Sequence, residues 1–279
     1  FLFKESRSRL PASPRLPDKS KFENRKRSPM SKITEINDDL KLIQNENGLT
    51  FGTDAYLLSA FTVGGKSKIG ADLGSGTGII PLLLCNREKA AKIYAVEVQK
   101  SFCDLIKQNA ELNGFKERII PLHKNVSDLK SADIGQELDF VVSNPPYMRA
   151  DSGKRNEFDE KFIARHEVCG SIGDFCACAN RLLKHGGRFY VVYRPDRLTD
   201  LLCALRENKL EPKVITFVSA TQESEPSMVL VRSVKGGASG NTVTKTLFLH
   251  DSKENAAKSI LSPDTAKIYE ICSFDEFLK

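Results

Sequence analysis

Hydrophobic and polar positions follow two different periods along the chain. Short apolar runs, typical of buried strands, alternate with longer segments. In these segments apolar residues recur about every 3.6 positions, which is typical of amphipathic helices. The apolar runs predict strands at residues 68–74, 92–98, 118–123, 138–143, 188–194, 211–218 and 226–235. The amphipathic runs predict helices at residues 78–88, 101–114, 170–187 and 196–209. This alternation indicates an α/β fold with a doubly wound parallel sheet and helices on both faces.

The last two predicted strands, residues 211–218 and 226–235, are joined by a short polar segment without a helix. A parallel pair needs a crossover of about a dozen residues, so this pair is predicted to be antiparallel. The expected sheet therefore has seven strands, is mostly parallel, and ends in a C-terminal antiparallel hairpin.

Ahead of the sheet, residues 40–52 alternate in a pattern that predicts a β-hairpin with Asn47 and Gly48 in its turn. Residues 53–61 predict a short helix, for which Thr53 or Asp54 is the expected cap. We expect a disordered basic tail, an N-terminal hairpin and helix, a main domain and a C-terminal extension, with bounds at residues 1–29, 30–65, 66–250 and 251–279.

The net charge of +6 comes entirely from residues 1–29. This tail holds nine basic and three acidic residues, and subtracting them from the totals of 42 and 36 leaves 33 of each sign. The tail lacks hydrophobic periodicity, so it cannot bury enough surface to offset its ordering entropy. Two interpretations stay open: an extension from a vector or upstream frame ahead of a natural start at Met30, or an RNA-contacting arm.

Composition argues against several classes of protein. No apolar run approaches the roughly 18 residues that span a bilayer, and no secretory signal pattern begins the chain, so we expect a cytoplasmic protein. Seven cysteines without paired spacing argue against a disulfide framework. Cys176 and Cys178 fall in an amphipathic helix pattern with no second pair nearby, so we favour core packing over a metal site.

A glycine-rich turn follows the first strand of the predicted sheet. Asp72 ends the strand, and Gly74, Gly76 and Gly78 form a G-x-G-x-G sequence that opens a helix. Glycine lets the backbone turn sharply and approach a ligand closely. A nicotinamide-binding loop is the main alternative, but it has G-x-G-x-x-G spacing, and Asp72 would repel a pyrophosphate. S-adenosylmethionine, which carries an ammonium and no phosphate, suits this turn better.

Two more acids are candidate cofactor ligands. Glu97 ends the second strand, nineteen residues beyond Gly78, where a carboxylate can accept both ribose hydroxyls of a nucleoside. A solvated acid at a strand end is the alternative. Asp128 follows the third strand and is a candidate acceptor for the adenine amine of the cofactor or a helix cap.

The fourth strand ends in the sequence Asn144-Pro145-Pro146-Tyr147, at the strand end where ligands bind in such sheets. The two prolines fix the backbone, so Asn144 is held in one conformation. The Asn144 side-chain oxygen and the Pro145 carbonyl are two acceptors for the N–H groups of a planar amine, and Tyr147 offers a stacking face. This motif predicts methyl transfer to an exocyclic or amide nitrogen. A purely structural Pro-Pro turn is the alternative.

Several segments together resemble the tRNA1(Val) (adenine(37)-N6)-methyltransferase family, within the class I S-adenosylmethionine-dependent methyltransferases that share the Asn-Pro-Pro-Tyr motif. The resemblance rests on "GLTFGTDAYLLSAF", "ADLGSGTGIIPLLL", "SNPPY", "ARHE", "LLKHGGRFYVVYRPDRL" and "SMVLVRSVKGG". It extends from about Leu40 to Gly237 and implies a Rossmann-like fold and methylation of the tRNA adenine 3′ of the anticodon.

The resemblance also implies roles for particular residues. Phe51, Thr53 and Asp54 would lie near the methionine end of the cofactor, and the motif from Asn144 to Tyr147 would hold the target amine. Asn144 is expected to bind the cofactor as well. Residues expected at the substrate entrance, with a surface salt bridge as the alternative for the last two, are Arg149, Arg165 and His166. Residues expected to line an RNA-binding rim are Arg149, Lys154, Arg155, Arg194, Arg197, Arg232 and Lys235.

Other functions remain as alternatives. The same motif occurs in methyltransferases for glutamine amides of release factors, which usually carry a helical N-terminal domain, whereas only a hairpin and a short helix are predicted here. A guanine amine in ribosomal RNA and an adenine in DNA are further substrates. A catalytically silent protein that binds cofactor and RNA is a hypothesis from a different class.

Overall fold

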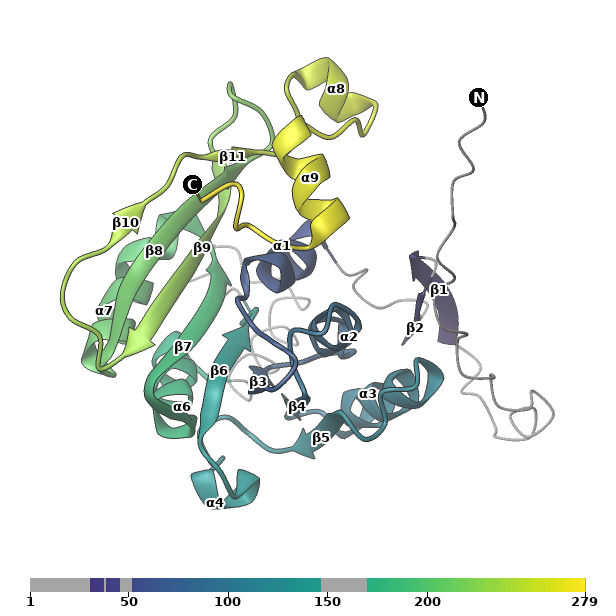
Figure 1. Cartoon of the computed structure of the whole chain (residues 1–279), viewed down its shortest axis with the longest axis vertical. Coiled ribbons are helices and arrows are strands. Elements are labelled where there is room, and N and C mark those ends of the chain that lie inside the picture. Colours follow the sequence, from purple (N-terminus) through teal and green to yellow (C-terminus); the bar gives the residue numbers. More distant parts are fainter. Residues whose placement is uncertain (1–30, 38, 46–51, 147–169, 279) are drawn as a thin grey trace, which may run out of the picture.

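The computed structural model describes residues 31–37, 39–45, 52–146 and 170–278. Seven strands form the body of one large sheet: β3 (Ile69–Leu73), β4 (Lys92–Glu97), β5 (Ile119–His123), β6 (Leu138–Ser143), β7 (Leu183–Tyr193), β8 (Leu210–Ser219) and β9 (Pro226–Lys235). Their order is β8-β9-β7-β6-β3-β4-β5 (Figure 1). Only β9 runs against its neighbours, so the predicted mostly parallel sheet with an antiparallel hairpin is confirmed.

The edge of the sheet carries two additional strands that the sequence did not predict. β10 (Thr242–Val243) and β11 (Leu247–Phe248) each contain two residues and pair in parallel with β8. They cover the outer side of β8, whose backbone groups would otherwise form an unpaired edge. The described sheet therefore has nine strands rather than seven.

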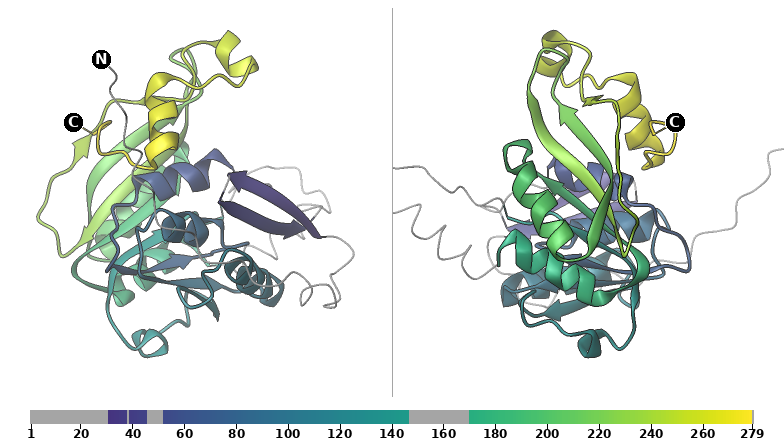
Figure 2. Two further views of the ribbon diagram at one scale, coloured as in Figure 1. Left: turned by 45° about the vertical axis from the view of Figure 1, so that its right-hand side comes forward. Right: turned by 90° about the vertical axis from the view of Figure 1, so that its left-hand side faces the viewer.

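Helices cover both faces of this sheet (Figures 1 and 2). The structure describes α1 (Thr53–Phe61), α2 (Ile79–Asn86), α3 (Lys100–Leu112), α4 (Ser131–Ile134), α6 (Ile172–Leu182), α7 (Leu198–Glu207), α8 (Lys253–Ala257) and α9 (Pro263–Ile271), with a short 3₁₀ helix η2 (Pro195–Arg197). One core contains residues of α1, α2 and α3, and a second core contains residues of α6 and α7.

The two cores are a direct result of the strand period. Side chains of successive strand residues point to opposite faces, so a strand covered on both sides is apolar at every position. In β7, Tyr190 and Val192 belong to the first core, while Phe189 and Val191 belong to the second. All four are fully buried, which explains the continuous apolar run seen in the sequence.

The N-terminal hairpin is formed by β1 (Ser31–Asn37) and β2 (Leu40–Asn45). Its turn is set by Asn37, whose side-chain oxygen accepts hydrogen bonds from the backbone N–H groups of Asp39 and Leu40 at 3.0 and 2.9 Å. Sequence reasoning did not single out β1 as the partner of this strand. The predicted turn at Asn47 and Gly48 lies outside the described residues.

Two predicted helix boundaries were wrong. The N-cap of α1 is Gly52, not Thr53 or Asp54, which occupy the first helical positions. The helix predicted over residues 170–187 ends at Leu182, because Leu183 is extended and already pairs with β6. Lys235 donates to the carbonyl oxygens of Asn180 and Leu183 at 2.7 and 2.6 Å and so satisfies the end of this helix.

The C-terminal residues pack against α1. Tyr269 of α9 stacks on Tyr56 of α1 with ring centroids 4.2 Å apart, and the Tyr56 hydroxyl donates to the Tyr269 carbonyl oxygen at 2.7 Å. Further along, Phe274 contacts Phe61 edge to face. The segment after residue 250 thus joins the first core and supports the helix that precedes the glycine-rich turn.

Candidate functional site

The glycine-rich turn connects β3 to α2. Gly74, Gly76 and Gly78 all have positive φ, at 74°, 55° and 84°, which side chains with a Cβ rarely adopt. The turn is tied to the next strand because the N–H groups of Gly74 and Ser75 both donate to the Val96 carbonyl oxygen at 3.0 Å. A Cβ placed on Gly76 would meet none of the described residues within 4 Å, so these residues leave the space above Gly76 open.

Asp72 is completely buried beneath this turn. One carboxylate oxygen accepts a 2.6 Å hydrogen bond from the Ser75 hydroxyl, while Oδ1 has no partner among the described residues. Burial, together with the nearby Glu97 carboxylate, raises the pKa of Asp72 to about 7, while the hydrogen bond from Ser75 lowers it in part. A buried acceptor without a partner is unfavourable, and a cationic ligand beside it would relieve this.

Glu97, at the end of β4, is 5% exposed and faces the same turn. Its two oxygens accept from the backbone N–H groups of Gly76 at 2.9 Å and Gln99 at 2.8 Å. Burial raises the pKa of Glu97, although these backbone hydrogen bonds lower it in part. A carboxylate has about four acceptor sites, so it retains capacity for two hydroxyl donors.

Asn109 is a site residue that sequence reasoning missed. It is completely buried in α3, where its side-chain N–H₂ donates to the carbonyl oxygens of Thr77 at 2.9 Å and Ile43 at 3.0 Å. Its oxygen accepts from the Ile43 N–H. Asn109 therefore joins the glycine-rich turn to β2. An asparagine within an amphipathic helix pattern gives only a weak signal of such a role.

Asp128 lies in an exposed turn after β5. It does not cap a helix: the N-cap of α4 is Lys130, whose backbone N–H donates to Asp133. The helix-cap alternative was therefore wrong, while a contact with the cofactor adenine stays a prediction.

The register of the sheet brings Asn144 beside the glycine-rich turn. Leu73, the last residue of β3, pairs with Ser143, the last residue of β6, and the Ser143 hydroxyl donates to the Leu73 carbonyl oxygen at 2.8 Å. Asn144 and Gly74 are the residues that follow, on strands about 4.8 Å apart. Two motifs separated by seventy residues thus begin at the same edge of the sheet.

The Asn144 side chain is held by α1. Its Nδ2 donates a 2.7 Å hydrogen bond to Oδ2 of Asp54, and Oδ1 of Asp54 accepts from the Ala55 N–H at 2.8 Å. Pro145 is buried and Pro146 is half-buried, so the turn after Asn144 is packed rather than loose. Asp54 and Asn144 are brought together as part of one site.

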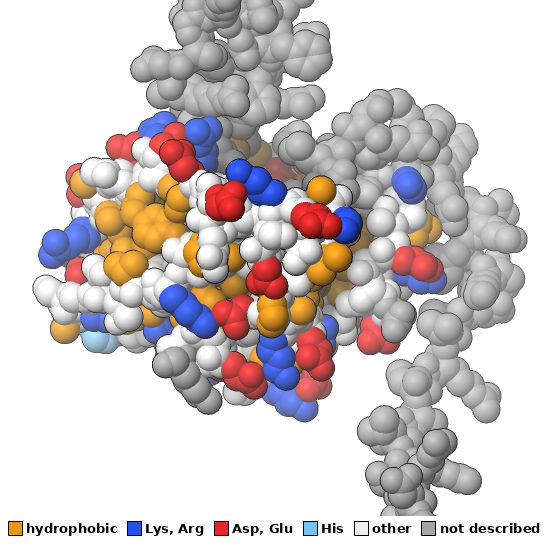
Figure 3. All heavy atoms as spheres, turned by 90° about the horizontal axis from the view of Figure 1, so that it is seen from above, with side chains coloured by type: hydrophobic (Ala, Val, Ile, Leu, Met, Phe, Trp, Pro, Cys, Tyr) orange, Lys and Arg blue, Asp and Glu red, His pale blue; other side chains and the backbone are white. Residues whose placement is uncertain are grey.

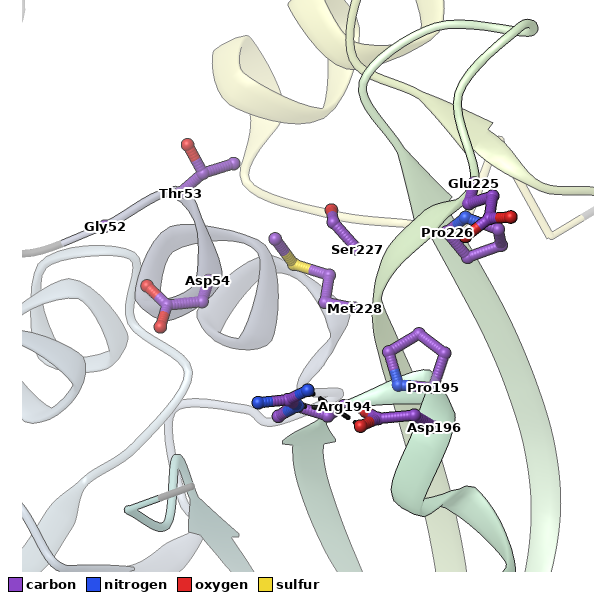
Figure 4. A pocket seen from close by; sticks show the side chains of 10 residues that line it. All are labelled: Gly52, Thr53, Asp54, Arg194, Pro195, Asp196, Glu225, Pro226, Ser227 and Met228. Atoms are coloured by element: carbon purple, nitrogen blue, oxygen red, sulfur yellow. Dashed lines mark hydrogen bonds and ion pairs between the residues drawn. The ribbon is translucent and has the colours of Figure 1, made fainter. Parts of the chain in front are cut away.

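An open pocket of about 950 Å³ lies beside Asp54 (Figure 4). It is lined by Asp54 and Thr53 of α1, by Arg194 after β7, and by Met228 near the start of β9. The Arg194 guanidinium forms a two-pronged ion pair with Asp196 at 2.9 and 2.7 Å. Met228 was not predicted, although an antiparallel β9 necessarily begins at the edge where the parallel strands end.

Several predicted site residues lie outside the described residues. They are Phe51, Tyr147, Arg149, Lys154, Arg155, Arg165 and His166. Their expected roles in stacking, cofactor contact, substrate entry and RNA binding stay predictions.

The predicted basic rim was partly wrong. Lys235 is the last residue of β9, at the opposite end of the strand from the pocket, and its amino group caps α6. Arg232 also lies away from the start of β9, where it pairs with Tyr190 of β7. Arg194 lines the pocket, and Arg197 is paired with Asp200. On the face that carries α8 and α9, basic and acidic side chains are interspersed (Figure 3).

Within the described residues, no group of three or more His, Cys, Asp or Glu side chains is arranged to hold a metal ion. In the same part of the chain, no helix has both the length and the apolar character needed to cross a membrane.

Comparisons with known proteins agree with this geometry. The chain is 28% identical to a tRNA1(Val) (adenine(37)-N6)-methyltransferase from Porphyromonas gingivalis over 229 residues, covering 78% of this chain and 86% of the relative. It is 26% identical to the protein of the same name from Flavobacterium psychrophilum, covering 80% and 87%. The resemblance inferred from the sequence motifs is thus confirmed.

Among solved structures, the fold is similar to that of a predicted O-methyltransferase from Agrobacterium tumefaciens, with a TM-score of 0.64 and 21% identity over 79% of this chain and 97% of the other. The family model for the methyltransferase small domain matches residues 45–202, more than half of the chain. The chain therefore belongs to the methyltransferase small domain family, and it is an S-adenosylmethionine-dependent methyltransferase with a class I fold.

Proposed function

We propose that this protein transfers a methyl group from S-adenosylmethionine to the exocyclic amine of an adenine in tRNA, at the position 3′ of the anticodon in a valine tRNA. The observation that carries the proposal is the pairing of Leu73 with Ser143, which sets the glycine-rich turn and Asn144 at one edge of the sheet. The names of the relatives from Porphyromonas gingivalis and Flavobacterium psychrophilum support the choice of substrate.

The residues around the glycine-rich turn suit this cofactor. The unpartnered Oδ1 of Asp72 suits the ammonium of the methionine group, and Glu97 suits the two ribose hydroxyls. The open space above Gly76 lets a ligand approach the backbone. When bound, the cofactor supplies an electrophilic methyl group on a sulfonium centre.

The chain's own contribution to the reaction lies at Asn144 and Pro145. The lone pair of an exocyclic amine is delocalised into the ring, which makes the nitrogen a poor nucleophile. The Asn144 side-chain oxygen and the Pro145 carbonyl oxygen would each accept one N–H of the amine and favour its tetrahedral form. The remaining rate enhancement comes from positioning. A general base is not needed, because the proton can leave to water after transfer.

The pocket lined by Asp54, the hydrogen-bond partner of Asn144, is large enough for a planar base, with Met228 and Pro195 as apolar walls. An adenine in the anticodon loop is already unpaired, so moving it into this pocket costs less than extracting a base from a duplex. The formally balanced charge of residues 30–279 favours recognition through this pocket over broad phosphate contacts. We expect the protein to act in the cytoplasm, where tRNA is modified.

The proposal is tested by incubating the purified protein with radiolabelled cofactor and unmodified tRNA. We expect label in the tRNA, and a loss of transfer of about 100-fold or more in Asn144→Ala, because the acceptor for the amine is removed. Calorimetry should show that this variant still binds cofactor.

Parallel reactions with release factor, ribosomal RNA and DNA complete the experiment. Label in release factor alone would favour the glutamine-amide reaction, and label in ribosomal RNA or DNA alone would favour those substrates. Cofactor binding with no transfer to any of the four would indicate a silent binding protein and overturn the proposal.

A further inference from the structure

Asp54 and Asn144 are ninety residues apart in the sequence and are joined by a 2.7 Å hydrogen bond. Asn144 follows β6 at the edge where the proposed reaction takes place, while Asp54 lies in the first turn of α1. The bond runs from Nδ2 of Asn144 to Oδ2 of Asp54. Asp54 is therefore bonded to Asn144, the side chain that is proposed to bind the target amine.

The chemistry of the two groups makes this bond directional. An amide side chain has a donor end and an acceptor end of nearly equal size, so its shape does not decide which end faces which way. An ionised carboxylate only accepts hydrogen bonds. Asp54 therefore requires the N–H₂ end of Asn144 to face α1 and directs the oxygen end elsewhere.

The Asp54 carboxylate is itself fixed in place. Its Oδ1 accepts a 2.8 Å hydrogen bond from the backbone N–H of Ala55, at the helix N-terminus, where negative charge is stabilised. The α1 helix packs against α9 through the stacking of Tyr56 on Tyr269. Burial raises the pKa of Tyr269, the Asp54 carboxylate raises it as well, and a hydrogen bond with Thr53 lowers it.

We propose that Asp54 is a positioning residue that sets the orientation of the Asn144 amide, so that its oxygen accepts an N–H from the substrate. This inference rests on the proposed function and extends it, because it names a residue outside the four-residue motif that selects amine-bearing bases. In a base with a carbonyl in place of the amine, the carbonyl oxygen would face the Asn144 side-chain oxygen. Both atoms are hydrogen-bond acceptors, so this base would be rejected.

The test compares two RNA hairpins with the sequence of the anticodon loop, one with adenine and one with hypoxanthine at the target position. These bases differ at this edge mainly by an amine in place of a carbonyl. We expect the wild-type protein to bind the adenine hairpin about 10- to 100-fold more tightly, the factor associated with unpaired polar groups. In Asp54→Asn the partner can donate as well as accept, so the Asn144 amide can turn over and the preference should fall to about threefold or less.

Kinetics with the adenine hairpin give a second readout. For Asp54→Asn and Asp54→Ala we expect kcat to fall by about 10- to 100-fold, which is more than the change in KM for cofactor, because the orientation of Asn144 is lost. In an Asn144→Ala background, Asp54→Ala should have almost no further effect on kcat, since its action passes through Asn144. Asp264→Asn is the matched control, because Asp264 lies in the first turn of α9 and is exposed.

The outcomes separate this inference from the function on which it rests. If the wild-type protein methylates no RNA, the proposed function fails and the inference fails with it. If the wild-type protein methylates the adenine hairpin but Asp54→Asn retains the full preference, or if the effects of Asp54→Ala and Asn144→Ala on kcat add, only the inference is overturned. Equal thermal stability of Asp54→Asn and Asp264→Asn would show that the loss does not come from unfolding.

Discussion

Leu73 and Ser143 form a cross-strand pair whose backbone ladder is reinforced by a 2.8 Å hydrogen bond from the Ser143 hydroxyl to the Leu73 carbonyl oxygen. Both residues are buried at the last position of their strands. Because parallel strands end at a common edge, everything that follows these two residues starts from fixed and adjacent positions. This pairing places the glycine-rich turn beside the motif that begins at Asn144, although the two are far apart in the sequence.

Cofactor binding should depend on pH through Asp72. Burial holds the pKa of this carboxyl at about 7 in the cofactor-free protein, so it is largely protonated at pH 6. An ammonium ligand requires the ionised form. We therefore expect cofactor affinity to rise between pH 5.5 and 7, approaching a tenfold gain per pH unit at the acid end, and then to level off.

Isothermal titration calorimetry in buffers of different ionisation enthalpy measures this dependence and the release of the proton. Asp72→Asn is the matched variant, because it cannot ionise, and its weaker binding should be flat across the same pH range. An equal slope in both proteins would show that another group titrates.

Gly76 should be required for binding and not for folding. Its φ of 55° disfavours alanine by about 1 kcal/mol, but a Cβ there meets no atom of the structurally described segments within 4 Å. The methyl group would instead occupy the space left for the ligand. We expect Gly76→Ala to lose about 1 kcal/mol of stability and about tenfold or more in cofactor affinity.

Gly135 provides the control for this substitution. It also has a positive φ, 77°, and a Cβ added to it would meet nothing within 4 Å in the described part of the chain, but it lies at the end of α4 away from the turn. Gly135→Ala should match the stability loss in chemical denaturation and leave cofactor affinity unchanged. Similar affinities for the two variants would argue against a ligand above Gly76.

Lys89 should be important for the stability of α1. Its amino group donates to the carbonyl oxygens of Ser59, Ala60 and Thr62 at 2.8 to 2.9 Å, at the end of the helix that carries Asp54. Lys89→Met would leave these acceptors without their donor, so we expect a loss of about 2–4 kcal/mol in the free energy of unfolding.

Urea denaturation measures this loss against Lys66→Met. Lys66 forms an exposed ion pair with Glu88 at 2.7 Å, which is expected to contribute less than about 1 kcal/mol. A similar small loss in both variants would show that α1 does not depend on the Lys89 contacts.

Patterns within single elements could be predicted from the sequence, and relationships between elements could not. The apolar run of β7 and the spacing of Gly74, Gly76 and Gly78 are local, so the strand, the turn and the cofactor class were predicted correctly. The partner of β2 is Ser31–Asn37, which depends on a side-chain turn at Asn37 that no apolar period marks.

The same limit applies to the site. Asp54 was placed near the cofactor by resemblance, but its bond to Asn144 arises only when α1 packs across the end of the sheet. Met228 lines the pocket because β9 runs antiparallel and begins at the reactive edge. Asn109 shows no pattern of its own, and its link between Thr77 and Ile43 follows from the docking of β2 on α3.

Mass spectrometry of nucleosides from unmodified tRNA treated with the protein and cofactor is the most direct test of methylation at the edge formed by Gly74 and Asn144. We expect N6-methyladenosine, located by nuclease mapping to the adenine 3′ of the anticodon and absent from reactions with Asn144→Ala. Unchanged adenosine in every tRNA, or an equal yield with Asn144→Ala, would contradict it.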